Sequence, residues 1–189
     1  TIQIANELRT RRCYFLDAPV SGGPEGAEAG TLSIMVGGEL SAFERCKEIL
    51  ERMGKSVFYL GDSSSGQKMK LINQALCSSY FLVVADAFRL SRSLNMKEED
   101  MLRVISRSWG DSPVFRHFLA VIGSGRYKDG AKIGLYTKDL SIISGIAKKR
   151  KLSMPIIELV LGYFLKASQL GYADFDASYM HLLLEKIAN

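Results

Sequence analysis

The chain has few of the residues on which disulfide frameworks and metal sites depend. Its 189 residues include three cysteines and two histidines. Cys13, Cys46 and Cys77 are odd in number, widely spaced and set in apolar segments, so we expect buried free thiols and a reducing compartment. His117 and His181 lie far apart, without cysteine or carboxylate pairs at ligand spacing, and the sequence therefore predicts no metal site.

Targeting and membrane segments are also missing from the pattern. No run approaches the roughly 20 uncharged apolar residues that span a bilayer, and the first residues lack the basic-then-apolar order of a signal peptide. We therefore expect a soluble, cytoplasmic protein without a membrane partner. No Gly-x-Gly-x-x-Gly turn opens a helix after a first strand, so no complete dinucleotide-binding site is visible.

The charge that is present is moderately positive, at a formal +5. Part of the excess lies in the run at 148–151, which is a pattern that nucleic-acid binders also use. The run ends an apolar-periodic stretch and precedes Pro155, so its cations suit the negative C-terminal end of a helix. We expect no nucleic-acid partner, and an anionic substrate or cofactor accounts equally well for the remaining bias.

Hydrophobic periodicity divides the chain into two parts. The first part predicts strands at 13–16, 32–36 and 57–60 and a helix at 42–53, with connections that allow parallel or reversing strands. A polar connection at 61–66 follows. The remainder predicts helices only, at 67–94, 97–106, 112–122, 135–151, 155–170 and 176–187. We therefore expect an α/β domain over 1–66 and an all-α domain over 67–189. The long first helix of that domain is apolar on nearly every face, which predicts burial on all sides.

A glycine-rich turn follows the first expected strand, in the order Asp17-Ala18-Pro19-Val20-Ser21-Gly22-Gly23. Successive N–H groups at Gly22 and Gly23, beside the hydroxyl of Ser21, can form a binding site for a carboxylate. A tight connection from strand to helix, capped by Ser21, explains the same residues. The local pattern alone favours this second interpretation.

A lysine and two amides share one face near the start of the long helix. Lys70, Asn73, Gln74 and Cys77 are spaced at i, i+3, i+4 and i+7. Partial desolvation of Lys70 in a cleft lowers the pKa of its amine toward the range that proton transfer needs, and either amide could then bind a substrate. The alternative is a lysine at a helix end with its ammonium in water.

Two further residues are open to a functional or a structural interpretation. Lys138, in Lys138-Asp139-Leu140, lies near the positive end of an expected helix, which indicates an anionic partner or a salt bridge. Trp109 is the only tryptophan and lies between two expected helices. It suits a pocket wall, but packing in the core is the default expectation.

Four segments, taken in order and separation, resemble the β-hydroxyacid dehydrogenase family, which includes 3-hydroxyisobutyrate dehydrogenase. They are Asp17 to Gly23, Gly30 to Gly38, Gly66-x-x-x-Lys70-x-x-Asn73-Gln74, and Lys138-Asp139-Leu140. The resemblance implies an α/β remnant of a Rossmann-type domain followed by an all-α C-terminal domain built on a long central helix. It also implies a fragment, because the family's glycine-rich nucleotide turn would lie upstream of Thr1.

The resemblance implies reversible hydride transfer between NAD or NADP and a small 3-hydroxy acid. The implied roles are substrate-carboxylate binding by Ser21, Gly22 and Gly23, proton transfer by Lys70, substrate orientation by Asn73, a substrate-side amide at Gln74, and a cofactor contact by Lys138. Without the upstream turn, we expect negligible cofactor affinity and little or no turnover by this chain alone.

The resemblance has one local departure and one alternative. Relatives commonly carry Phe where this chain has Ala131, so one wall of the pocket is expected to differ. The alternative is a non-catalytic oligomerisation or chromatin-associated module on the same fold, but its mark would be loss of the catalytic lysine, and Lys70 is present. Both interpretations predict a homo-oligomer, a dimer or a tetramer, because the long helix is too apolar for the later helices to cover.

Overall fold

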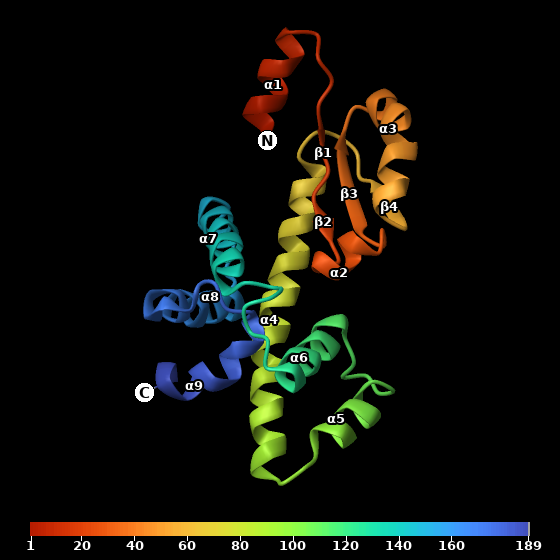
Figure 1. Ribbon diagram of the computed structural model, residues 1–189. Helices are drawn as coiled ribbons and strands as arrows, with labels where there is room; N and C mark the ends of the chain where they lie inside the picture. The colour runs from red at the N-terminus through yellow and green to blue at the C-terminus, as the bar shows by residue number, and fades with distance from the viewer. Residues whose placement is uncertain (189) are drawn as a thin grey trace. The chain divides into compact units, whose positions relative to one another are not determined.

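The computed structural model describes residues 1–188 and divides into two compact units, Thr1–Asn73 (unit 1) and Gln74–Asn189 (unit 2). The division falls inside the longest helix, α4 (Ser65–Ser93), which Figure 1 draws as one unbroken helix. The sequence places the boundary after residue 66, at the start of this same helix. The expected architecture, an α/β part followed by helices only, is present.

The sheet of unit 1 is organised around β3 (Ser33–Gly38). On one side β3 pairs in parallel with β4 (Ser56–Tyr59), and α3 (Leu40–Met53) connects the two and packs against both (Figure 1). This is the crossover connection that parallel neighbours require. The strands and the helix expected at 32–36, 57–60 and 42–53 are confirmed to within a few residues.

The other neighbours of β3 are the short strands β1 (Leu16–Asp17) and β2 (Val20–Ser21), both antiparallel to it. Leu16 lies opposite Gly38 and Ser21 opposite Ser33, so one register runs through both strands. The ladder is interrupted between them because Pro19 has no N–H to donate.

Two expectations for this region are wrong. A strand at 13–16 is expected, but pairing begins only at Leu16. The connection from strand to helix leads into α2 (Gly23–Glu28), but its N-cap is Gly22 and no side chain caps it, so Ser21 is not the cap. Proline and closely spaced glycines carry little hydrophobic periodicity, so the pattern is silent here. The helix α1 (Ile2–Thr10) precedes this region, and the hydrophobic core of unit 1 comprises Leu32, Ile34, Val36, Phe43 and Leu50.

Unit 2 is helical and is built around the later turns of α4. All the helices expected there are present, as α5 (Glu98–Ile105), α6 (Pro113–Ser124), α7 (Ile133–Lys149), α8 (Pro155–Ala167) and α9 (Met180–Ala188), with the short helical turns η1 (Ser168–Tyr172) and η2 (Ala177–Tyr179). The core is aromatic. Phe88 of α4 meets Phe118 of α6 edge to face, with ring centroids 5.7 Å apart, and meets His181 of α9 at 5.4 Å.

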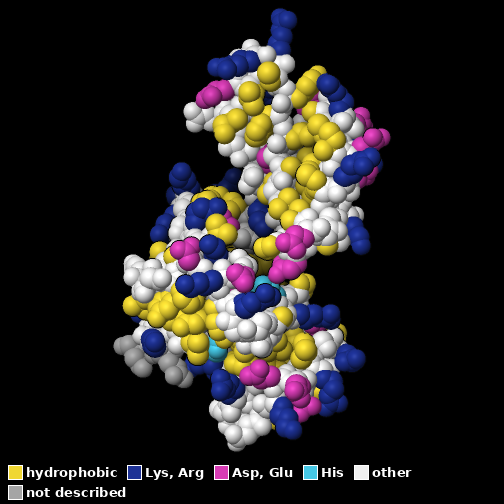
Figure 2. Space-filling model, viewed as in Figure 1, with side chains coloured by type: hydrophobic (Ala, Val, Ile, Leu, Met, Phe, Trp, Pro, Cys, Tyr) yellow, Lys and Arg dark blue, Asp and Glu magenta, His cyan; other side chains and the backbone are white. Residues whose placement is uncertain are grey.

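Within the single chain, α4 is not buried on all sides, so the expectation of full burial is wrong there, whereas the later helices do leave part of it uncovered as expected. Leu76, Val83 and Leu90 of α4 are exposed, and Figure 2 shows hydrophobic side chains at the surface of both units. Within residues 1–188, α4 is also the single helix long and apolar enough to cross a membrane by length and composition, and 39% of that apolar window is buried. This is weak evidence for a membrane span, because the core helix of a soluble protein passes the same test.

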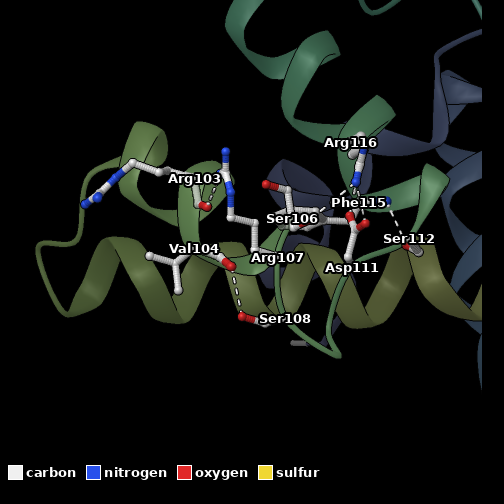
Figure 3. A network of polar contacts seen from close by, with 9 residues as sticks. All are labelled: Arg103, Val104, Ser106, Arg107, Ser108, Asp111, Ser112, Phe115 and Arg116. Carbon is white, nitrogen blue, oxygen red and sulfur yellow. Dashed lines mark hydrogen bonds and ion pairs between the residues drawn. The ribbon is translucent and has the colours of Figure 1, made fainter.

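Two further burial expectations are wrong. Cys13 is exposed, whereas Cys46 and Cys77 are half-buried. Trp109 is fully exposed instead of packing in the core. It lies in the α5–α6 loop, where Asp111 accepts hydrogen bonds from the Arg116 guanidinium at 2.6 and 2.9 Å (Figure 3). These bonds hold the pKa of Asp111 below its usual range. The loop is therefore closed by polar contacts and leaves its tryptophan outside.

Candidate functional site

A buried carboxylate of unit 1 holds the start of α4. Asp17 is 3% exposed, and its Oδ1 and Oδ2 accept hydrogen bonds from the N–H groups of Ser64 at 2.6 Å and Gln67 at 2.9 Å. The first N–H groups of a helix have no partner within the helix, so an acceptor from another segment satisfies them. The carboxylate also complements the partial positive charge of a helix N-terminus.

Two glycines make this close approach possible. A Cβ on Gly66, in the first turn of α4, would overlap the carbonyl oxygen of Met35 and lie 2.8 Å from the Asp17 carbonyl oxygen. A Cβ on Gly37, opposite Asp17 in the sheet, would lie 2.8 Å from both Asp17 Oδ1 and the Gly66 nitrogen. The backbones of β1, β3 and α4 therefore meet where only glycine fits.

The amine of Lys70 lies beside the glycine-rich turn. Lys70 Nζ donates a hydrogen bond to the carbonyl oxygen of Val20 at 2.7 Å, and Val20 immediately precedes Ser21. In that turn Gly22 and Gly23 adopt positive φ values of 138° and 66°. Ser21 is half-buried and both glycines are exposed. The structure thus brings together, within unit 1, Lys70 and the turn predicted to bind a carboxylate.

Asn73 and Gln74 follow Lys70 along α4 and have different surroundings. Asn73 is half-buried and is the last residue of unit 1. Gln74 is buried in unit 2, and its Nε2 donates a hydrogen bond to Asp139 Oδ2 at 2.9 Å. Asp139 Oδ1 in turn pairs with Lys138 Nζ at 3.1 Å. Gln74 therefore supports the Lys138-Asp139 segment, and its contact with substrate stays a prediction.

Lys138 lies in the second turn of α7 and has a side chain that is 63% exposed. Both explanations offered for this lysine, a salt bridge and an anionic partner, are compatible with that position. The salt bridge to Asp139 is present. The exposed ammonium keeps further donors for an anion, because it carries three N–H groups.

A second buried carboxylate, Asp176, organises the loop that precedes α7. Asp176 is 0% exposed, and its oxygens accept hydrogen bonds from the N–H groups of Ala131 at 2.7 Å and Ser178 at 2.8 Å. His117 Nε2 of α6 lies 2.9 Å from Asp176 Oδ2. Burial raises the pKa of Asp176, but the hydrogen bonds from His117 and Ser178 outweigh burial and hold this pKa below its usual value. Ala131, where a difference in the pocket wall is expected, is thus fixed by this carboxylate.

The site predicted from the sequence does not include three acidic residues that have clear partners in the structure. Asp17 follows an apolar run and precedes the proline-containing turn, and this is a visible signal for a carboxylate at a strand end. Asp139 is adjacent to the predicted Lys138. No sequence signal connects Asp176 with His117, which lies 59 residues away. Within residues 1–188, no group of three or more His, Cys, Asp or Glu side chains is placed to hold a metal ion.

An α/β segment followed by a helical unit, with a lysine beside a glycine-rich turn, is an arrangement that can be compared with known protein families. A model described as the NAD binding domain of 6-phosphogluconate dehydrogenase matches residues 1–61. A model described as NAD-binding of NADP-dependent 3-hydroxyisobutyrate dehydrogenase matches residues 64–184, more than half of the chain. The chain belongs to the β-hydroxyacid dehydrogenase family, and NAD or NADP is the cofactor class of this family.

Individual relatives agree with this assignment. The chain is 31% identical over 179 residues to 2-(hydroxymethyl)glutarate dehydrogenase of Eubacterium barkeri, covering 94% of this chain and 60% of that protein. It is 32% identical over 184 residues to NAD-dependent L-serine dehydrogenase of Pseudomonas aeruginosa, covering 94% and 62%. The solved structure of 3-hydroxyisobutyrate dehydrogenase from Salmonella typhimurium superposes with a TM-score of 0.87 at 28% identity, covering 96% and 64%.

The comparisons bear on the fold and on the length of the chain. The fold class expected from the sequence, part of a Rossmann-type domain followed by an all-α domain on a long helix, is confirmed by the superposition. The chain spans about 60% of the length of the curated relatives it matches.

Proposed function

We propose that this chain carries the substrate-binding and proton-transfer residues of an NAD(P)-dependent 3-hydroxyacid dehydrogenase. The observation that carries the proposal is the 2.7 Å hydrogen bond from Lys70 Nζ to the Val20 carbonyl oxygen, because it holds the amine beside Ser21 and the two following glycines. The amine of Lys70 can act as a base and the turn at Ser21 can bind an anion. Together they suit a substrate that carries a hydroxyl group near its carboxylate.

The names of the three relatives reported above support a particular arrangement of that substrate. The 2-(hydroxymethyl)glutarate, L-serine and 3-hydroxyisobutyrate named in them each carry a hydroxymethyl group on the carbon next to a carboxylate. We assign the same arrangement to the substrate of this protein. The carboxylate then accepts hydrogen bonds from the Ser21 hydroxyl and from the N–H groups of Gly22 and Gly23.

In the oxidation, neutral Lys70 accepts the proton of the substrate hydroxyl while the C–H bond of the same carbon breaks and the carbonyl forms. Nicotinamide dinucleotide, when bound, supplies the hydride acceptor. The contact with Val20 has a defined part in this step. One N–H of Lys70 donates to that carbonyl, which directs the nitrogen lone pair away from Val20. In the reduction, the ammonium of Lys70 returns the proton, and Asn73 orients the substrate oxygen.

Lys138 is the residue of unit 2 that we assign to the cofactor. Its exposed ammonium suits the anionic groups of a dinucleotide, and Asp139 Oδ1 lies 3.1 Å from the same ammonium. The sequence of this chain contains no glycine-rich nucleotide turn, so we expect low affinity for the cofactor and little turnover by the 189 residues alone.

The decisive experiment assays the full-length protein against a panel of 3-hydroxy acids with NAD and with NADP. Lys70→Ala is expected to lower kcat by about 10²- to 10⁴-fold, the range for loss of a positioned acid/base group. Lys68→Ala is the matched control, because Lys68 is an exposed lysine of the same helix turn. Turnover by Lys70→Ala at a rate comparable with the parent would remove Lys70 from the mechanism and favour the non-catalytic alternative.

We also propose that the protein is a homo-oligomer, a dimer or a tetramer, that covers the exposed apolar side chains of α4. Leu76, Val83 and Leu90 of this helix are exposed and would gain by burial against a second copy. Sedimentation over a range of concentrations is expected to give a mass above that of one chain, and Val83→Glu is expected to lower it. A monomer at every concentration contradicts this proposal.

A further inference from the structure

We propose that Asp17 is the positioning residue of Lys70: by capping α4 from the neighbouring strand, it sets where the Lys70 amine lies relative to the Ser21 turn. The catalytic meaning of this placement rests on the function proposed above. The placement itself is a property of unit 1 and can be measured without turnover.

The first argument is that one short segment contacts α4 at two points. The Asp17 carboxylate accepts from the N–H groups of Ser64 and Gln67, and three residues later the Val20 carbonyl accepts from Lys70. Lys70 lies three residues after Gln67, or about 4.5 Å along the helix axis. Two contacts separated in this way fix both the height and the rotation of the first turns of α4, which a single contact would not do.

The second argument is that a carboxylate is required at this position. Asp17 is buried, and both of its oxygens accept from backbone N–H groups. Asparagine is isosteric but supplies one acceptor oxygen, and its amide nitrogen would place N–H groups against an N–H of the helix start. Replacement by Asn therefore exchanges one attraction for a repulsion and removes the charge that complements the helix N-terminus.

The third argument comes from the backbone of Ser64. This buried serine has a φ of 78°, a conformation unfavourable for a residue with a side chain. Such a conformation persists where the surroundings hold it in place. The Ser64 carbonyl oxygen accepts from the Lys68 N–H at 2.9 Å, and the 2.6 Å hydrogen bond from the Ser64 N–H to Asp17 holds the same residue from the neighbouring strand. Loss of this bond is expected to release Ser64 and unwind the first turn of α4 toward Lys70.

The test compares Asp17→Asn with the parent 189-residue chain, using two readouts. Amide exchange is followed by NMR at Ser64 and Gln67, and reductive methylation with ¹³C-formaldehyde measures the accessibility of the Lys70 amine against that of Lys68 in the same helix. We expect both the exchange rates and the Lys70/Lys68 labelling ratio to rise about fivefold, which corresponds to loss of one hydrogen bond of average strength.

Asp62→Asn is the matched control, because it removes the same charge from an exposed position just before α4, and it should change neither readout. If Asp17→Asn does not fold, Gln67→Pro replaces it. Proline is tolerated in a first helical turn and deletes one donor to Asp17 while leaving the carboxylate intact. It should raise the labelling ratio of Lys70 in the same direction.

Faster exchange at Ser64 and Gln67 with unchanged labelling of Lys70 would overturn the proposal, since Asp17 would then cap the helix without positioning the amine. The function proposed for Lys70 fails separately. In the full-length protein, retained activity of Lys70→Ala removes that function, yet leaves the effect of Asp17→Asn on labelling intact. If both hold, Asp17→Asn should lower kcat about fivefold, and Asp62→Asn should not.

Discussion

Each unit contains one buried aspartate that accepts hydrogen bonds from two backbone N–H groups, but the two aspartates have different neighbours. Asp17 of unit 1 holds the start of α4, where the glycines at 37 and 66 admit it to the backbone. Asp176 of unit 2 holds the loop before α7 and also contacts the imidazole of His117. Unit 1 is therefore sensitive to added volume at its aspartate, and unit 2 to loss of a charged network.

The hydrophobic cores of the two units also differ. Unit 1 has a small core of four aliphatic side chains and Phe43. Unit 2 has fully buried phenylalanines from several helices, including Phe81, Phe118 and Phe164. Apolar burial stabilises by about 25 cal/mol per Å², so we expect burial of these large side chains to stabilise unit 2 more than unit 1. Its buried aspartate nevertheless connects more segments than Asp17 does, and the comparison can be tested residue by residue.

The largest effect is expected from Asp176→Ala. It leaves the N–H groups of Ala131 and Ser178 without their acceptor, at about 1–3 kcal/mol for each buried group, so we expect a loss of about 3 kcal/mol or more. Urea unfolding of the chain measures it. Asp174→Ala is the control, because Asp174 is exposed and only pairs with Lys132, and it should cost about 0.5 kcal/mol or less. Equal effects of the two variants would deny Asp176 its organising role.

The next effect concerns the glycine contact of unit 1. Gly66→Ala forces a methyl group onto the Met35 carbonyl and should destabilise the chain by about 2–3 kcal/mol. Gly162→Ala, inside α8, adds the same methyl group where nothing lies within 4 Å. It should stabilise by up to about 1 kcal/mol, the difference in helix propensity. Thermal unfolding of both variants tests this opposition, and a gain in stability from Gly66→Ala would contradict the close approach of α4 to the sheet.

Helices of unit 2 could be predicted because they are long and each contributes several apolar residues at helical spacing. The stretch from β1 to α2 could not, because two-residue strands on either side of Pro19 and a six-residue helix rich in glycine leave no periodic pattern. The hydrophobic periodicity also does not predict which individual residues are buried. Trp109 is exposed in a loop that also contains Asp111, and the ion pair of Asp111 with Arg116 cannot be derived from residue type.

The candidate site was predicted only in part. Spacing on one helix is sufficient to group Lys70 with Asn73 and Gln74. That Lys70 lies beside the Ser21 turn depends on a contact across 50 residues, for which only the family resemblance gave grounds. Gln74 illustrates the limit, because a shared helix face did not predict its hydrogen bond to Asp139.

A third, smaller effect depends on pH and should appear in unit 2, which contains both histidines. Burial lowers the pKa of His181 below its ordinary value of about 6.5. The unfolded chain then binds a proton that the folded chain does not, so stability should fall as pH falls below about 6.5. The slope is at most about 1.4 kcal/mol per pH unit, the value for one proton.

His181→Gln isolates this contribution from that of His117. The difference in unfolding free energy between parent and variant, measured by urea unfolding from pH 7.5 to 5, should narrow as pH falls. A difference independent of pH would show that His181 is protonated alike in the folded and unfolded states. Amide exchange should locate the destabilisation in residues of unit 2, with unit 1 unchanged.

The smallest effect should come from Ser64→Gly, and it has the opposite sign. Glycine adopts the φ of 78° without the cost of about 1 kcal/mol that a side chain incurs, so the variant should be more stable by up to that amount. Asn95→Gly is the matched control, since Asn95 has a φ of 54° but is exposed, and asparagine tolerates this region better. Its gain should be smaller. Thermal unfolding of both variants measures the two gains, and a larger gain for Asn95→Gly would mean that Ser64 stores little strain. The comparison of the two aspartates would then change, because Asp17 would hold a relaxed turn and its importance to Lys70 would rest on the helix cap alone.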